Sequence, residues 1–203
     1  MSDTTNGAPE GAPTKAPKKV APPRYSDVSG IVADFISEGF AEIQSVGEEF
    51  REIYDNAPEN LQQTDLNQRR DATASEIENL SEPQPSSSTL AELDCSTRLD
   101  NGAVYRGRQQ QSRACRAANG AAKLRAAADA INEWLANNDE LPEADPNDAD
   151  SMRARADKLD ELADAGISAE DYDDARNEAE DLARECEDIA DCVENLEFPG
   201  MFG

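Results

Sequence analysis

A run of apolar and small residues near the C-terminus constrains the fold more than any other feature of this chain. Its members recur at alternating steps of three and four residues, which aligns them on one face of an α-helix. They are Tyr172, Ala175, Ala179, Leu182, Cys186, Ile189, Val193 and Leu196. Asp and Glu fill nearly every position between them. The pattern predicts a long helix with one buried seam and a strongly charged outer surface.

The composition of this C-terminal seam indicates how it is buried. Two alanines and a cysteine occupy three of its eight positions, which is poor for a free-standing dimer but suits tight packing within one chain. Just upstream, residues 152–163 carry a second stripe, and Gly166 followed by Ser168 marks a helix end and a new N-cap. Two helices joined by so short a loop are expected to fold back as an antiparallel hairpin.

The N-terminal half carries another helical stripe. We expect a helix from Val28, capped by Ser26 or Asp27, to about Asn56, because Pro58 disfavours helical geometry before it. The following helix, residues 65–80, has only a weak stripe. The first helix is therefore the best candidate for oligomerisation or partner binding. Its candidate contact residues are Ile36, Ile43, Val46, Phe50 and Ile53. Two glycines on this helix, Gly39 and Gly47, indicate either close approach of another backbone or simple tolerance.

The middle of the chain is read as one long helix from Val104 to Ala136. Its later part has a good apolar seam, whereas its earlier part is polar and rich in arginine. Arg106 and Arg113 continue the face of that seam. Buried arginines need carboxylates or solvent, so we expect them to meet the acidic C-terminal helices.

These patterns together predict an all-α protein. The expected architecture is a set of antiparallel helical hairpins forming a small helical bundle or coiled coil, with a disordered N-terminal arm and a C-terminal antiparallel three-helix unit. The expected segments are a disordered tail (1–25), an N-terminal helical segment (26–81), a linker (82–89), an Arg-containing helical segment (90–137), a connection (138–147), an acidic antiparallel hairpin (148–197) and an apolar C-terminal tail (198–203).

Charge narrows the functional classes. The formal net charge is −25, which disfavours general affinity for nucleic acid or anionic membranes. Histidine is absent, which removes the commonest general base and the commonest transition-metal ligand. No phosphate-binding loop or nucleophile motif occurs. We therefore expect a protein that is not an enzyme, with no cofactor and no metal, whose four cysteines are free thiols.

The acidity is interrupted by a basic block. Residues 96–131 hold seven positive and two negative side chains, and both flanking regions are strongly acidic. The simplest interpretation is that carboxylates of the same chain neutralise these cations. The alternative is contact with nucleic acid or an acidic partner, for which the candidates are Arg106, Arg108, Arg113 and Arg116. Aromatic residues are sparse in the block, so nucleic acid is the weaker of these two. A further alternative is that the acidic helices mimic DNA and inhibit a host nucleic-acid-binding protein.

The C-terminal sequence FPGMFG is apolar and cannot continue a helix. Phe198, Met201 and Phe202 would form an exposed patch if left free. Two outcomes are open: the tail folds back on the helices, or it docks on a partner.

Two stretches resemble pieces of small uncharacterised helical proteins of tailed bacteriophages. They are EEFREIYDNAPENLQQ, residues 48–63, and VENLEFPGMFG, residues 193–203. The resemblance implies a viral accessory or structural helical protein with no activity to transfer. The acidity and low lysine content are also typical of high-salt adaptation, as in a haloarchaeal host or virus. With no export signal or apolar span in the sequence, we expect a protein of the host cytoplasm or the virion that binds a protein partner or itself.

Overall fold

A computed structural model describes residues 24–106, 108–138, 140–143 and 145–199. The predicted disordered arm therefore lies almost wholly outside the described residues. Within them the chain is mostly helical, with two small antiparallel sheets besides the helices. The helices are α1 (Val32–Asp55), α2 (Glu59–Gln62), α3 (Asp65–Glu78), α4 (Ser88–Ala91), α5 (Arg113–Asn137), α6 (Ala149–Asp164) and α7 (Ala169–Asn195). The strands are β1 (Tyr25–Ile31), β2 (Asp94–Asp100), β3 (Ala103–Tyr105) and β4 (Arg108–Gln110).

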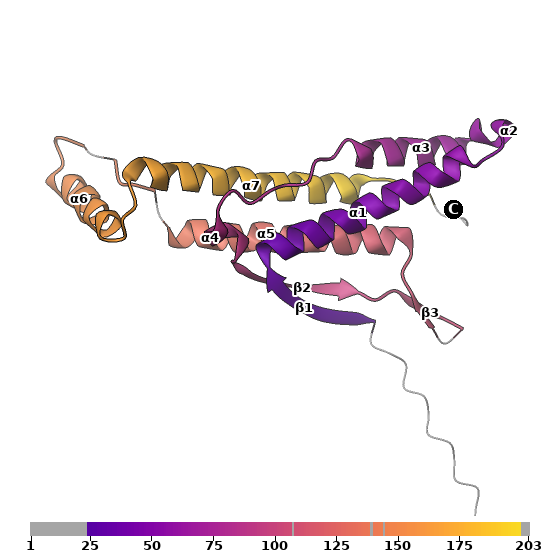
Figure 1. Cartoon of the computed structure of the whole chain (residues 1–203), viewed down its shortest axis with the longest axis horizontal. Helices are drawn as coiled ribbons and strands as arrows, with labels where there is room; N and C mark the ends of the chain where they lie inside the picture. The colour runs from indigo at the N-terminus through magenta and orange to yellow at the C-terminus, as the bar shows by residue number, and fades with distance from the viewer. Residues whose placement is uncertain (1–23, 107, 139, 144, 200–203) are drawn as a thin grey trace, which may run out of the picture.

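Helix α5 lies between the strands and the helices α1 and α7 (Figure 1). Both α1 and α7 pack on it, and α3 packs on the far side of α1 (Figure 1). Close approach of α1 and α5 depends on two glycines, because a Cβ on Gly39 would lie 2.8 Å from the carbonyl oxygen of Gly120. A Cβ on Gly120 would lie 2.5 Å from the carbonyl oxygen of Gly39. Of the two interpretations of Gly39 from sequence, close backbone approach is the one observed.

The C-terminal seam is buried as predicted, and its main partner is α5. Ala179, Cys186 and Val193 are almost fully covered, as are Leu182 and Ile189. Tyr172, at the start of α7, belongs instead to a small separate cluster with Leu141 and Leu162. The seam thus acts as scaffold, since most of its length packs against a helix of its own chain.

The prediction that α6 and α7 pack along each other as an antiparallel hairpin is wrong. The turn itself forms as expected: Gly166 adopts φ +74°, and the Ser168 hydroxyl accepts a hydrogen bond from the Asp171 N–H at 3.0 Å. However, α6 turns away at the end of α7 and does not run along it, so no three-helix unit of α5, α6 and α7 forms (Figure 1). Because α5 already covers the seam, α6 buries only Leu162, and Met152 is half exposed.

The all-α expectation fails at two places, and both are strands. Residues 25–31, read as tail and helix start, form β1, and α1 begins only at Val32. The predicted long helix was to begin at Val104, but residues 103–105 and 108–110 form the paired strands β3 and β4. Helix α5 begins only at Arg113, behind an N-cap at Ser112. Strand β1 pairs with β2 from Tyr25↔Asp100 to Ile31↔Asp94. That pairing joins segments about seventy residues apart, which no local periodicity reveals.

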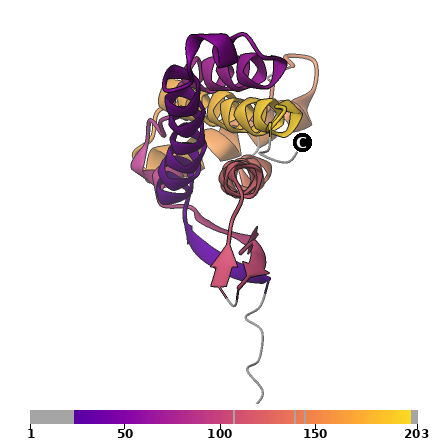
Figure 2. The same ribbon diagram turned by 90° about the vertical axis from the view of Figure 1, so that its right-hand side faces the viewer.

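The four strands form one projection, which we call the β-arm (residues 25–31 and 94–110). In Figure 1 the β-arm lies below α1 and α5, with β1 outermost, while α3 lies on the opposite side. The view in Figure 2 agrees, with the strands and α3 at opposite ends of the molecule. No described helix is long and apolar enough to cross a membrane.

Candidate functional site

The α1 stripe proposed for partner binding is not a free surface in this structure. Ile36, Ile43, Val46 and Phe50 are buried against the chain's own helices, and Ile53 is partly buried. The physical reason is that α5, far along the chain, supplies the apolar partner that the weak neighbouring helix α3 could not supply alone. The α1 stripe therefore forms part of the core and offers no free contact surface in this structure.

The basic block is neutralised along most of its length, and α1 is its main partner. Arg113 Nε lies 2.7 Å from Glu49 Oε2, and Arg116 bonds the other oxygen of the same carboxylate. Partial burial raises the pKa of Glu49, but the hydrogen bonds from Arg116 and Arg113 outweigh it and hold that pKa below its usual value. The prediction that Arg113 meets the acidic C-terminal helices is therefore wrong; its carboxylate comes from α1.

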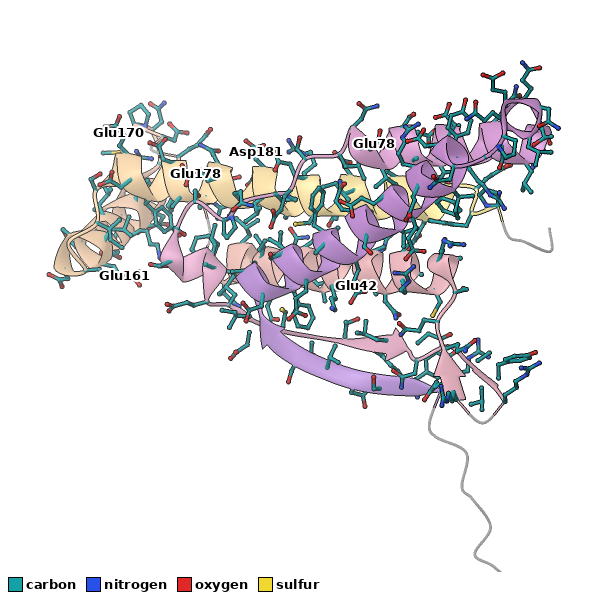
Figure 3. The ribbon with its side chains drawn as sticks, turned by 45° about the vertical axis from the view of Figure 1, so that its right-hand side comes forward. Glu42, Glu78, Glu161, Glu170, Glu178 and Asp181 are labelled. Carbon is teal, nitrogen blue, oxygen red and sulfur yellow. The ribbon has the colours of Figure 1, made fainter. Side chains whose placement is uncertain are left out.

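Two further cations of α5 are also paired. The Lys123 ammonium, only 8% exposed, lies 2.8 Å from Glu42 and 3.1 Å from Glu38 of α1. Figure 3 shows Glu42 at the boundary between α1 and α5. Burial lowers the pKa of Lys123, yet the hydrogen bonds to the two carboxylates outweigh it and raise the pKa overall. Arg125 does reach the C-terminal helix, because it lies 2.6 Å from Asp191 and 2.9 Å from Glu194.

Arg106 and Arg108 are different, because they lie on the β3–β4 hairpin and not on a helix. Both are exposed, and among the described residues neither has a carboxylate within ion-pair distance. Arg106 adopts φ +49°, a left-handed conformation that tight hairpin turns require and that non-glycine residues rarely adopt. Its guanidinium lies 5.2 Å from the centroid of the Tyr105 ring. The four candidate arginines thus divide into an internal pair and an exposed pair.

The hairpin also carries exposed apolar surface. Tyr105 is 58% exposed and Val104 is 46% exposed. At the adjoining end of β1, Tyr25 is 42% exposed, and the guanidinium carbons of Arg24 and Arg98 lie 5.4 and 5.1 Å from its ring centroid. Exposed aromatic rings beside arginine are the combination that protein interfaces favour.

The hairpin is anchored firmly to the helical body through Asp100. Its backbone N–H donates to Asn119 Oδ1 of α5 at 2.9 Å, and the Asn119 amide donates back to its carbonyl oxygen at 2.9 Å. The Asp100 carboxylate accepts from the Gly102 N–H at 2.8 Å and pairs with Arg24 at 3.2 Å. These bonds lower the pKa of Asp100. The β3–β4 hairpin therefore starts from a fixed point.

A cleft of about 620 Å³ lies between the β-arm and α5. Three carboxylates line it, from Asp94, Asp129 and Glu133. Its other wall includes Cys95, whose pKa burial raises to about 11, so the thiol is a poor nucleophile at neutral pH. Among the described residues there is no group of His, Cys, Asp and Glu side chains that could hold a metal ion. The cleft is therefore lined by negative charge and by a thiol that stays protonated at neutral pH.

The C-terminal tail is described only in part. Phe198 is partly buried and packs on the core, with its ring centroid 6.4 Å from that of Phe50. Met201 and Phe202 lie outside the described residues. The start of the tail, at Phe198, therefore folds back on the helices, which is one of the two outcomes expected from sequence.

All four cysteines are free thiols. Burial raises the pKa of Cys186 to about 12, and it also raises those of Cys115 and Cys192. Comparison with known proteins adds no identity: no protein-family model, no curated protein and no solved structure matches this chain. The candidate site therefore depends on geometry alone, and it is the β-arm with its hairpin tip.

Proposed function

We propose that this chain is a non-enzymatic protein–protein interaction or assembly protein, and that the β3–β4 hairpin is its contact surface. The observation that carries the proposal is the division of the basic block. Between residues 101 and 128 there is no acidic residue. Among the described residues, carboxylates pair with every cation of that stretch except Arg106 and Arg108.

An acidic patch on a protein is the partner chemistry that fits this hairpin. Two unpaired guanidiniums beside an exposed tyrosine offer bidentate pairing and aromatic contact together. The rest of the molecule is strongly acidic, so a large polyanion such as duplex nucleic acid would be repelled from most of its surface. A partner with a local acidic patch would meet the hairpin without approaching the acidic helices.

For the biological setting we keep the one that the sequence resemblance implies. A viral accessory or structural protein, of a phage or a haloarchaeal virus, would act in the host cytoplasm or within the virion. In a high-salt cell, surface ion pairs are screened, and the apolar contribution of Val104 and Tyr105 would then carry more of the binding.

Affinity capture with a charge-reversed hairpin tests the proposal. The double variant Arg106→Glu/Arg108→Glu is compared with the wild type in a lysate of the organism that carries the gene. Arg153→Glu/Arg184→Glu, which changes exposed arginines of α6 and α7, is the control with equal net charge. We expect a partner that is retained by wild type and control but lost by the hairpin variant. Equal capture by all three proteins would contradict the proposal. Binding of labelled DNA or RNA that disappears only in the hairpin variant would instead assign the hairpin to nucleic acid.

A second candidate, inhibition by DNA mimicry, is favoured by the outer face of α7. Exposed carboxylates recur there every three or four residues, and Figure 3 shows Glu170 and Asp181 on that outer side. Glu178 is also exposed, and it accepts a hydrogen bond from the Ser86 hydroxyl. A mimic would bind a basic DNA-binding protein through this row, and competing duplex DNA would release the partner. The variant Glu170→Gln/Glu178→Gln/Asp181→Asn would then lose capture, whereas the hairpin variant would keep it.

A further inference from the structure

The β1–β2 ribbon has one edge that meets the helical body and one that does not. The Asn101 N–H donates to the Arg24 carbonyl at 2.6 Å, and the Val32 N–H donates to the Leu93 carbonyl at 2.9 Å. Hydrogen-bonded pairs alternate along an antiparallel ladder. The backbone groups of Ser26, Val28 and Gly30 therefore face β2, while those of Tyr25, Asp27, Ser29 and Ile31 point away from it.

The two edges of the ribbon differ in the hydrogen bonds that the rest of the chain makes to them. On the β2 side, Asn119 of α5 bonds both backbone groups of Asp100. On the β1 side, none of the described residues bonds the outward N–H and C=O groups of Asp27 or Ser29. In Figure 1 this strand is the outermost element of the β-arm. Among the described residues, the β1 edge therefore has no backbone partner at Asp27 or Ser29, whereas the β2 edge is held to α5 at Asp100.

The β1 edge lacks the usual protection against strand pairing. Natural edge strands are blunted by proline, lysine, a bulge or very short length. Strand β1 has seven residues, YSDVSGI, in unbroken register with β2, and Asp27 is its only charge. A two-stranded sheet is also marginal on its own in water, and further strands stabilise it.

We propose that β1 pairs antiparallel with β1 of a second copy of this chain, about a two-fold axis at Val28, to form a four-stranded sheet. The strand is self-complementary in this register: Asp27 faces Ser29 of the second copy, and Tyr25 faces Ile31. Aromatic and β-branched residues form favourable cross-strand pairs. All seven residues of β1 are used, and outward-facing backbone groups meet outward-facing backbone groups along the whole strand.

Charge disfavours the neighbouring register that is centred on Asp27. Shifting the axis to Asp27 would place the two Asp27 carboxylates directly opposite each other, which is destabilising. With the axis at Val28, each Asp27 faces a neutral serine of the second copy. Its Oδ1 also retains the ion pair with Nε of Arg98 in its own copy, at 3.9 Å. The same register sets Arg24 of one copy opposite Val32 of the other, two residues from Asp34 in the first turn of α1. This interface goes beyond the proposed function, because it uses the strand edge and leaves the hairpin tip free.

Sedimentation of Ser29 variants tests the interface. Ser29→Asp places a carboxylate opposite Asp27 twice in the dimer, whereas Ser29→Lys places an ammonium there twice. At about 0.2–1 kcal/mol for each cross-strand pair, the aspartate should weaken dimerisation roughly 2- to 30-fold and the lysine should strengthen it. The control is Ser96→Asp, because Ser96 is the β2 neighbour of Ser29, is also exposed and changes net charge equally.

The wild-type chain should dimerise more tightly as salt rises, because added salt screens the repulsion between two chains of net charge −25. A wild-type chain that stays monomeric at about 1 M salt, where the Debye length is about 3 Å, would overturn the proposal. So would a dimer that Ser29→Asp and Ser96→Asp weaken equally.

Cross-linking gives the register independently. In a chain with Cys115 and Cys192 replaced by serine, Val28→Cys should oxidise to a disulfide-linked dimer, because the axis brings residue 28 against itself. Ser26→Cys, which would face Gly30 of the second copy, should not. Cross-linking of both variants would contradict the two-fold register at Val28. So would the absence of cross-linking in both, provided that circular dichroism shows that the variants are folded.

Discussion

Shortening Ile43 to alanine distinguishes a buried core from an interface on α1. The Ile43 side chain is fully buried, and a Cβ on Gly120 would lie 2.8 Å from its Cγ1. Backbone this close cannot collapse into the cavity, so the free energy of unfolding should fall by about 3–5 kcal/mol, the upper part of the range for such truncations. Total stabilities of domains are about 5–15 kcal/mol, so the loss is a large fraction.

Urea unfolding followed by circular dichroism measures this change, and the melting temperature should fall by roughly 6–20 °C. The matched control is Ile53→Ala, in the same helix and stripe, because Ile53 is only partly buried and should lose clearly less. An Ile43→Ala protein of unchanged stability that loses only self-association would refute the burial argument and restore the α1 stripe as an interface.

Three other features give testable expectations. Gly39→Ala and Gly120→Ala should each destabilise the fold, although alanine has the higher helix propensity, because the new Cβ would clash with the carbonyl oxygen of the facing glycine. A higher melting temperature in either variant would contradict the close crossing of α1 and α5. The folded-state pKa of Glu49 is depressed, so its contribution to stability is present above the unfolded pKa of about 4.3 and disappears as the pH falls through the folded value. Glu49→Gln should therefore flatten the acid limb of the stability–pH curve, and an unchanged limb would show that the arginines do not stabilise the carboxylate. Cys186 should react with iodoacetamide far more slowly than Cys115 in the folded protein, because it is buried and its pKa is about 12, and mass spectrometry of labelled peptides measures the ratio.

Local signals in the sequence predicted the helices well. The turn between α6 and α7 was predicted from Gly166 and Ser168, whose conformations the structure confirms. The buried seam of α7 was predicted from its spacing alone. Both depend on interactions within a few residues, which a sequence pattern records directly.

The choice of partners could not be read from the sequence. The spacing of a seam shows which face is buried but not what covers it. We predicted that α7 packs with both α6 and the Arg-bearing helix as a three-helix unit, whereas it packs along α5 and not along α6. The same limit applies to the arginines: internal neutralisation was expected, but Glu49 is more than sixty residues from Arg113, and the acidic helices looked equally suitable.

The β-arm was missed for a related reason. YSDVSGI does alternate between exposed and partly buried positions, but only Val28 and Ile31 are strongly apolar, so its period of two is weak. Its pairing partner, β2, lies beyond four helices in the sequence. For the hairpin tip, Gly102 and Gly107 on either side of Val104–Arg106 were the available signal against a helix.

Amide hydrogen exchange of β1, followed residue by residue by NMR, tests the central claim that the β-arm presents a free strand edge. In dilute solution the amides of Val28 and Gly30 should be protected by β2, while those of Asp27 and Ser29 exchange rapidly. As concentration and salt rise, Asp27 and Ser29 should become protected as well. Rapid exchange of all four amides would contradict the β1–β2 pairing, and protection of all four in the dilute monomer would show that the edge is already covered.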